Sequence, residues 1–292
     1  MSKFDDLFKL YNCNLNDENV KQDIDKIITA HYAENNNLEV YKQCLNQIDL
    51  TSLNGSDTQE EIIAMVEKIN GFKAVYPLLP NVAAICVYPS LIPVVKANLT
   101  ENIEIAAVSA GFPASQTFIE IKVAETAMCV LEGATEIDVV ISIGKFLEEK
   151  YEEVYEELTE IKAFCREAKL KVILETGALK TASNIMKASI LAMAAGADFI
   201  KTSTGKIPVA ATLEATYVMC QAIKAWNAKN KIKVSFKPAG GIVTTEDAVK
   251  HFTLVKEILG NEWLNNTKFR FGASRLANNL LTSIEGKEAK YF

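Results

Sequence analysis

The 292-residue sequence predicts an α/β fold, a parallel (β/α)8 barrel of eight strands (a TIM barrel) that follows an N-terminal helical extension. From about residue 47 onward, short apolar strands alternate with amphipathic helices, and eight such strand–helix units can be counted. No glycine-rich turn follows the first strand, although open doubly wound sheets usually carry one there and use fewer strands. A closed barrel is therefore favoured over an open sheet.

The predicted elements divide the chain into three parts. Residues 1–46 form the extension, which we expect to pack on the barrel, with helical spacing from about residue 19 and a break at the asparagines 35–37. Residues 47–284 form the barrel, and residues 285–292 form a mobile tail. We expect barrel strands at 47–51, 83–87, 105–108, 137–141, 171–174, 197–201, 232–236 and 269–272. The helices between and after them are expected at 58–70, 91–97, up to 132, 151–168, 181–194, 210–228, 246–259 and 274–283.

The composition argues against several classes of function. A net charge of −6 without a basic run is unlike a nucleic-acid-binding surface. No apolar run approaches the roughly 18 residues that span a bilayer, and the acidic N-terminus is unlike a signal peptide, so no membrane partner is expected. Six widely spaced cysteines without a CxxC pair indicate free thiols in a reducing cytoplasm. Two histidines supply too few ligands for a His-based zinc site, and no metal is expected.

Lys201 is the first candidate for catalysis. The apolar residues Phe199 and Ile200 place it at the end of a buried strand, where the sequence changes to small hydroxyl residues and glycine. Loss of solvation disfavours the ammonium form of a lysine and makes available the neutral amine that attacks carbonyls. The alternative is an ordinary surface lysine, as most lysines are. Its surroundings must decide between the two.

Two further charges interrupt apolar strands at the same end of the barrel. Asp138 and Lys237 each break a buried run, which is costly unless the charge is paired or used. An ammonium on Lys237 would keep Lys201 neutral, and Asp138 could move protons. A structural ion pair of Asp138 with either lysine is the alternative. Asp49, Thr176 and Thr202 lie at the ends of the first, fifth and sixth strands and are further candidates for substrate contacts.

Glycines at the strand ends indicate an anion site. Backbone N–H groups of Gly240 and Gly241, together with Gly205-Lys206 and the helix beginning at Ser274, could hold a phosphate. Loops after the seventh and eighth strands of such barrels often do so. Glycine pairs also serve simply as turns, and this alternative stays open.

The chain resembles the class I deoxyribose-phosphate aldolases through a series of motifs that run in order. They are IDLTSL at 48–53, AICVYP at 84–89, AGFP at 110–113, EIDVV at 136–140, DFIKTSTGK at 198–206, FKPAGG at 236–241 and RFGAS at 270–274. The resemblance implies a (β/α)8 lyase that reversibly cleaves 2-deoxy-D-ribose 5-phosphate to D-glyceraldehyde 3-phosphate and acetaldehyde in deoxyribonucleoside catabolism. It implies that the enzyme uses no cofactor and that its ligands are a phosphorylated deoxysugar and aldehydes. A homodimer stays open.

The resemblance also implies roles for individual residues. Lys201 would form the Schiff base, Lys237 would perturb it, and Asp138 would relay protons through a water. Asp49 would contact substrate hydroxyls, and Cys86 would lie near the pocket as a non-catalytic thiol. The phosphate would be held by Gly205, Lys206, Gly240, Gly241 and Ser274.

Three positions depart from the family pattern. Val243 stands where many relatives have arginine, and Arg275 stands where they have a second small hydroxyl residue. We expect Arg275 to replace the missing positive charge at the phosphate. Tyr291 is penultimate, before Phe292, whereas the family often ends in a tyrosine whose mobile tail assists proton transfer.

Other functions share parts of this pattern. A phosphosugar isomerase or another Schiff-base aldolase would have the same phosphate loops, and acetaldehyde release separates them from the expected reaction. A non-catalytic sugar-phosphate-binding protein would also fit the loops. It would have no need of two lysines and an aspartate at the strand ends.

Overall fold

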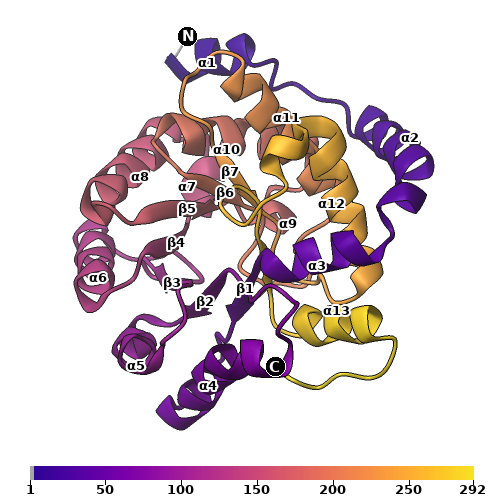
Figure 1. Ribbon diagram of the computed structural model, residues 1–292. Helices are drawn as coiled ribbons and strands as arrows, with labels where there is room; N and C mark the ends of the chain where they lie inside the picture. Colours follow the sequence, from indigo (N-terminus) through magenta and orange to yellow (C-terminus); the bar gives the residue numbers. More distant parts are fainter. Residues whose placement is uncertain (1–2) are drawn as a thin grey trace.

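The structure, a computed structural model, describes residues 3–292 and contains eight parallel strands in a near-closed barrel surrounded by helices (Figure 1). The predicted fold class is confirmed. The strands are β1 Ile48–Thr51, β2 Ala84–Val87, β3 Glu104–Ser109, β4 Glu136–Val140, β5 Lys169–Ile173, β6 Phe199–Lys201, β7 Ser235–Lys237 and β8 Phe271–Ala273. They are ordered β7-β6-β5-β4-β3-β2-β1-β8. Two parallel bridges, Phe236–Phe269 and Ala239–Gly272, join the edge strands β7 and β8.

Helices cover the outside of the barrel because each buries one apolar face against the strands. They are α4 Gln59–Val75, α5 Ile92–Asn98, α6 Ile119–Glu132, α7 Ile143–Leu147, α8 Tyr151–Cys165, α9 Thr176–Leu179, α10 Ala182–Ala194, α11 Leu213–Asn227, α12 Thr245–Leu259 and α13 Leu276–Glu285. Two 3₁₀ turns, η1 Pro89–Leu91 and η2 Asn261–Trp263, complete the set. Thr58 begins α4 through a capping box with Glu61, and Thr244 begins α12 through one with Asp247.

Some element bounds differ from those predicted. Strands β7 and β8 begin later than expected, because the apolar residue Ile232 is 74% exposed in the preceding loop and Phe269 pairs only through a bridge. The single-turn helices α7 and α9 lie in segments expected to be irregular. Short helices of this kind have no full amphipathic period, so the hydrophobic pattern does not reveal them.

The N-terminal extension wraps around one side of the barrel (Figure 1). It consists of α1 Lys3–Leu10, which was not predicted, α2 Asp17–Asn35 and α3 Leu38–Asn46. The expected break between α2 and α3 is present, and the Asn37 side chain caps α3. Helix α1 packs Phe4 and Phe8 against Tyr151 of α8, while α2 contacts α11 and α12, and α3 contacts α12 and α13. The extension therefore shares the core of the barrel.

The C-terminal tail lies against α4 and α13 rather than over the strand ends (Figure 1). The Asn278 side chain accepts hydrogen bonds from the backbone N–H groups of Tyr291 and Phe292, at 2.8 and 2.9 Å. The Phe292 ring stacks on Phe72 with centroids 5.3 Å apart. The structure thus shows the tail in a docked position.

Two general expectations can be compared with the structure. No helix within residues 3–292 is long and apolar enough to cross a membrane. All six cysteines are free and buried. Their thiols are therefore packing groups rather than cross-links.

Candidate active site

The carboxyl ends of the strands surround a pocket of about 280 Å³. Lys201, at the end of β6, lines this pocket together with the loops that follow β1, β6, β7 and β8. The six residues predicted to bind phosphate all line it as well: Gly205, Lys206, Gly240, Gly241, Ser274 and Arg275. The structure therefore brings the predicted nucleophile and the predicted anion site to one cavity.

Asp138 lies between the two predicted catalytic lysines. Its Oδ2 accepts hydrogen bonds from Lys201 Nζ at 2.7 Å and Lys237 Nζ at 2.8 Å, and all three side chains are buried. The other carboxylate oxygen, Oδ1, has no hydrogen-bond partner among the described residues. One oxygen of Asp138 is thus occupied by the two lysines, while the other lies 3.9 Å from Lys171 Nζ and can accept a further hydrogen bond.

Asp49 ties this group to a deeper set of charges. Its carboxylate contacts Lys237 Nζ at 2.5 Å, Lys171 Nζ at 2.7 Å and the Arg270 guanidinium at 2.5 Å. Glu136 in turn forms ion pairs with Lys171 and, at 3.1 Å, with Arg270. Asp49 is therefore held by three cations inside the barrel, and its predicted contact with substrate hydroxyls stays a prediction.

The buried cluster contains more basic than acidic side chains. Its members are Asp49, Glu136, Asp138, Lys171, Lys201, Lys237 and Arg270. Four of these are bases and three are carboxylates, so the cluster is neutral when one base is uncharged. Because a net charge is costly to bury, one lysine is expected to lose its proton readily.

Lys201 is the lysine best placed to do so. Burial lowers its pKa, and the ammonium group of Lys237 lowers it further, against the opposing effect of Asp138. For Lys237 the balance is reversed, since Asp138 and Asp49 together outweigh burial and raise its pKa. Burial also acts to raise the pKa of Asp138, but Lys201 and Lys237 hold that pKa well below its usual range. The site therefore pairs a lysine biased toward the neutral amine with a permanent ammonium and a carboxylate.

Three other predicted residues, Cys86, Thr202 and Thr176, lie close to this centre. Cys86 is buried in an apolar group with Leu53 and Val108, and burial raises the pKa of its thiol, as expected for a non-catalytic cysteine. The Thr202 hydroxyl exchanges hydrogen bonds with the backbone of Ala239, which joins β6 to the loop after β7.

The Thr176 hydroxyl faces Ser203 at 3.3 Å and the carbonyl of Ala210 at 3.4 Å. Neither Thr176 nor Thr202 lines the pocket that contains Lys201. Their substrate contacts stay predictions.

Tyr291 is not part of the strand-end site in this structure. Its hydroxyl donates to the backbone carbonyl of Lys68 on α4 at 2.7 Å, and its ring packs on Phe72 and Tyr76. The proton relay predicted for it would require the tail to leave this position.

Sequence reasoning missed three buried charges near the site: Glu136, Lys171 and Arg270. A signal was present for two of them. Glu136 is two residues before Asp138, and Lys171 is the strand partner of Asp138, so both share its face of the sheet. Charges at the beginning of a strand resemble an exposed strand end, and this resemblance hid them.

Replacing Arg270 by methionine is expected to lower the free energy of unfolding by about 3–5 kcal/mol, because two buried carboxylates lose a cation. Urea unfolding followed by circular dichroism measures the change. The control is Arg166→Met, on the exposed end of α8, for which we expect a change within about 0.5 kcal/mol. Equal effects of the two substitutions would contradict a stabilising role for the Arg270 ion pairs.

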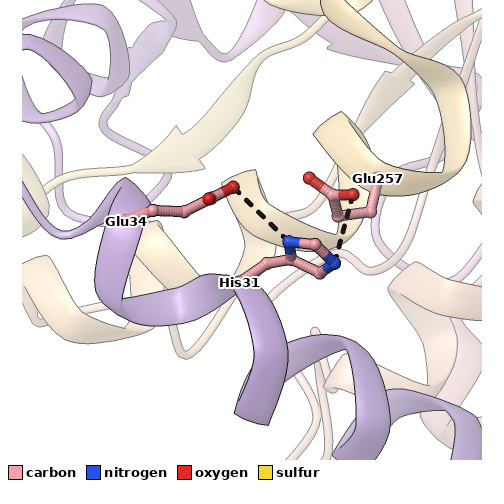
Figure 2. A group of neighbouring side chains, drawn as sticks. All are labelled: His31, Glu34 and Glu257. Atoms are coloured by element: carbon pink, nitrogen blue, oxygen red, sulfur yellow. Dashed lines mark ion pairs between the residues drawn. The ribbon is translucent and has the colours of Figure 1, made fainter.

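A second group of titratable side chains lies on the outside of the barrel, between α2 and α12. Figure 2 shows His31 between Glu34 and Glu257, with Nδ1 3.4 Å from Glu34 and Nε2 3.6 Å from Glu257. One metal ion could take only one of these nitrogens, and Lys256 already contacts Glu34 at 3.3 Å. The contacts of His31 with Glu257 and of Glu34 with Lys256 join the extension to the barrel, and we assign no metal to this group.

Comparisons with known proteins relate this chain to aldolases. A model of the DeoC/LacD family aldolases matches residues 44–257. A deoxyribose-phosphate aldolase of Homo sapiens is 43% identical over 253 residues, which cover 81% of this chain and 78% of the human protein. A Caenorhabditis elegans protein, to which that activity is provisionally assigned, is 44% identical over 272 residues, 90% of this chain and 88% of its own. A crystal structure from Coccidioides immitis, provisionally described in the same way, has a TM-score of 0.70 at 25% identity and covers 93% of this chain and 99% of that chain.

Proposed function

The chain belongs to the DeoC/LacD family of aldolases, and we propose that Lys201 is the Schiff-base lysine through which it acts as a deoxyribose-phosphate aldolase. Such an enzyme is a class I aldolase, an aldehyde-lyase. The observation that carries the assignment of Lys201 is its position in the pocket, 2.7 Å from Asp138 and beside the glycine loops. The direct test is release of acetaldehyde from 2-deoxy-D-ribose 5-phosphate by the purified chain.

In the first step, the neutral amine of Lys201 attacks C1 of the open-chain aldehyde. The carbinolamine loses water, and the resulting iminium withdraws electrons from the sugar chain. The lowered pKa of Lys201 supports this role because the amine needs no strong base to free its lone pair.

Cleavage then removes the proton of the C3 hydroxyl. A water bound to Oδ1 of Asp138 takes this proton and passes one of its own to the carboxylate, which returns it through the water when C2 is later protonated. The C2–C3 bond breaks, and its electron pair forms an enamine with the iminium. D-glyceraldehyde 3-phosphate leaves, the enamine is protonated at C2, and hydrolysis of the new iminium releases acetaldehyde and Lys201. Lys237 keeps the other oxygen of Asp138 in place at 2.8 Å.

The phosphate is proposed to bind where the loops after β6 and β7 meet. Gly205 and Gly240 both have positive φ, and a Cβ on Gly240 would lie 2.7 Å from the Ala210 side chain and 3.0 Å from Gly205 Cα. Only glycine allows this close approach of two backbones. The approach supports a built anion cradle of backbone N–H groups more than two unrelated turns.

Replacing Arg275 by serine is expected to raise KM for 2-deoxyribose 5-phosphate about tenfold and to leave KM for unphosphorylated 2-deoxyribose unchanged. Arg275 lines the pocket together with Val243 and is absent from the ion pairs of residues 3–292. It therefore has a charge free for the phosphate. Steady-state kinetics with both sugars measure the effect, and the exposed Arg166→Ser serves as control. An unchanged KM ratio would remove Arg275 from the phosphate site.

Location and assembly are proposed from other observations. Six buried free thiols support a cytoplasmic location. A homodimer stays a prediction, and sedimentation equilibrium of the full chain tests it.

A further inference from the structure

Glu175 is a buried carboxylate outside the catalytic cluster. It follows β5, is 2% exposed, and has left-handed backbone angles of φ 55° and ψ 59°. The ion pairs found within residues 3–292 include none with Glu175. A buried, unpaired carboxylate on a strained backbone costs free energy and persists only where its surroundings hold it.

Its hydrogen bonds hold the loop after β6. Glu175 Oε1 accepts the backbone N–H of Thr204 at 3.2 Å, and Oε2 accepts the Thr204 hydroxyl at 2.5 Å. Because that hydroxyl donates to Glu175, its lone pairs can accept the backbone N–H of Lys206 at 3.0 Å. The carboxylate thus fixes Thr204, and through it Lys206, on the two sides of Gly205.

The same turn also holds the far end of this loop. The hydroxyl of Thr176 lies 3.4 Å from the carbonyl oxygen of Ala210. A Cβ on Gly177 would lie 2.1 Å from the carbonyl oxygen of Val209, so the two backbones are in close contact. The turn at residues 175–177 therefore holds the loop after β6 at both ends.

We infer that Glu175 is a positioning residue for the phosphate: it sets the conformation of residues 204–206 before substrate binds. The inference rests on the proposed function and extends it to a residue that does not line the pocket. A loop already held in its binding conformation loses less entropy when the phosphate arrives. The strained backbone at Glu175 is what brings its carboxylate to Thr204.

Glu175→Ala is expected to raise KM for 2-deoxyribose 5-phosphate about tenfold and to change kcat/KM for unphosphorylated 2-deoxyribose less than about twofold. Substitution of a residue that only stabilised the fold would lower kcat/KM for both sugars by the same factor. Glu175→Gln can still accept the Thr204 N–H and donate to its hydroxyl, so it should stay within about threefold of the original KM. The control is Glu149→Ala, at an exposed glutamate with the same left-handed backbone (φ 60°). This substitution should change neither KM nor kcat/KM for either sugar.

Thr204→Val provides a second test that keeps the shape of the side chain but removes the hydroxyl. It should raise KM for the phosphorylated sugar as Glu175→Ala does, and the double variant should show no additional loss. Equal losses of kcat/KM for the two sugars would overturn the inference. So would a Glu175→Gln variant whose KM for the phosphorylated sugar is as high as that of Glu175→Ala.

Binding of inorganic phosphate, measured by titration calorimetry, separates this inference from the proposed function. The affinity should be about tenfold weaker in Glu175→Ala than in the unmodified chain, whether or not acetaldehyde is released. If the unmodified chain releases no acetaldehyde from either sugar, the proposed function fails. If phosphate binds equally to both proteins, the role of Glu175 fails.

Discussion

Replacing Lys201 by leucine lowers kcat/KM for 2-deoxyribose 5-phosphate by at least about 10⁴-fold, because no other neutral amine can form the iminium. The nearby Lys237 cannot substitute, since Asp138 and Asp49 raise its pKa and keep it an ammonium. Release of acetaldehyde measures the rate. Borohydride reduction during turnover should attach a two-carbon fragment to Lys201, and mass spectrometry of the peptide that contains it locates the adduct.

The control for this substitution is Lys229→Leu, on an exposed residue after α11. In this variant, borohydride should still trap the two-carbon fragment on Lys201, and kcat/KM should equal that of the unmodified chain. Full activity of Lys201→Leu, or an adduct on another lysine, would reject the assignment.

The sequence was sufficient to identify the centre of the site because its residues violate local patterns. Lys201 ends an apolar run, and Asp138 and Lys237 interrupt apolar runs. Each violation is visible within a few neighbouring residues, so no knowledge of the barrel was needed to find them. Their convergence followed from the rule that parallel strands end at one edge.

The partners of Asp49 could not be found in this way. Lys171 is 122 residues and Arg270 is 221 residues from Asp49 along the chain, and only the closure of the barrel brings them together. Which side chains meet inside the barrel depends on the stagger between strands, and apolar periodicity does not encode that stagger. The charge balance that favours a neutral Lys201 was therefore accessible only from the structure.

Thr202 and Glu175 show two different limits. Thr202 follows Lys201 directly, and the alternation of side chains along a strand places it on the other face, where it bonds to Ala239. The predicted contact of Thr202 with substrate therefore does not follow from its position next to Lys201, and it stays a prediction. Glu175 reaches Thr204 only through a left-handed backbone, and nothing in a glutamate side chain predicts that conformation.

Replacing Lys237 by leucine is expected to lower kcat at pH 7 by about 10³-fold and to move the acidic limb of the pH–rate profile to higher pH. The ammonium of Lys237 lowers the pKa of Lys201, and its removal leaves Lys201 as the main partner of Asp138. Lys201 then stays protonated to a higher pH, so the fraction of neutral amine at pH 7 falls. Activity should recover in part as the pH is raised toward about 9.

The matched variant Lys237→Arg separates the effect of the positive charge at position 237 from the effect of the geometry of its contact with Asp138. A guanidinium keeps the positive charge beside Lys201, so the acidic limb should stay near its original position, while the larger group disturbs Asp138 and lowers the rate. Profiles of kcat/KM against pH for both variants test this. If the limb does not move in Lys237→Leu, the charge of Lys237 does not set the pKa of Lys201, and burial alone must account for it. If it moves equally in both variants, the geometry of the Lys237–Asp138 contact sets that pKa.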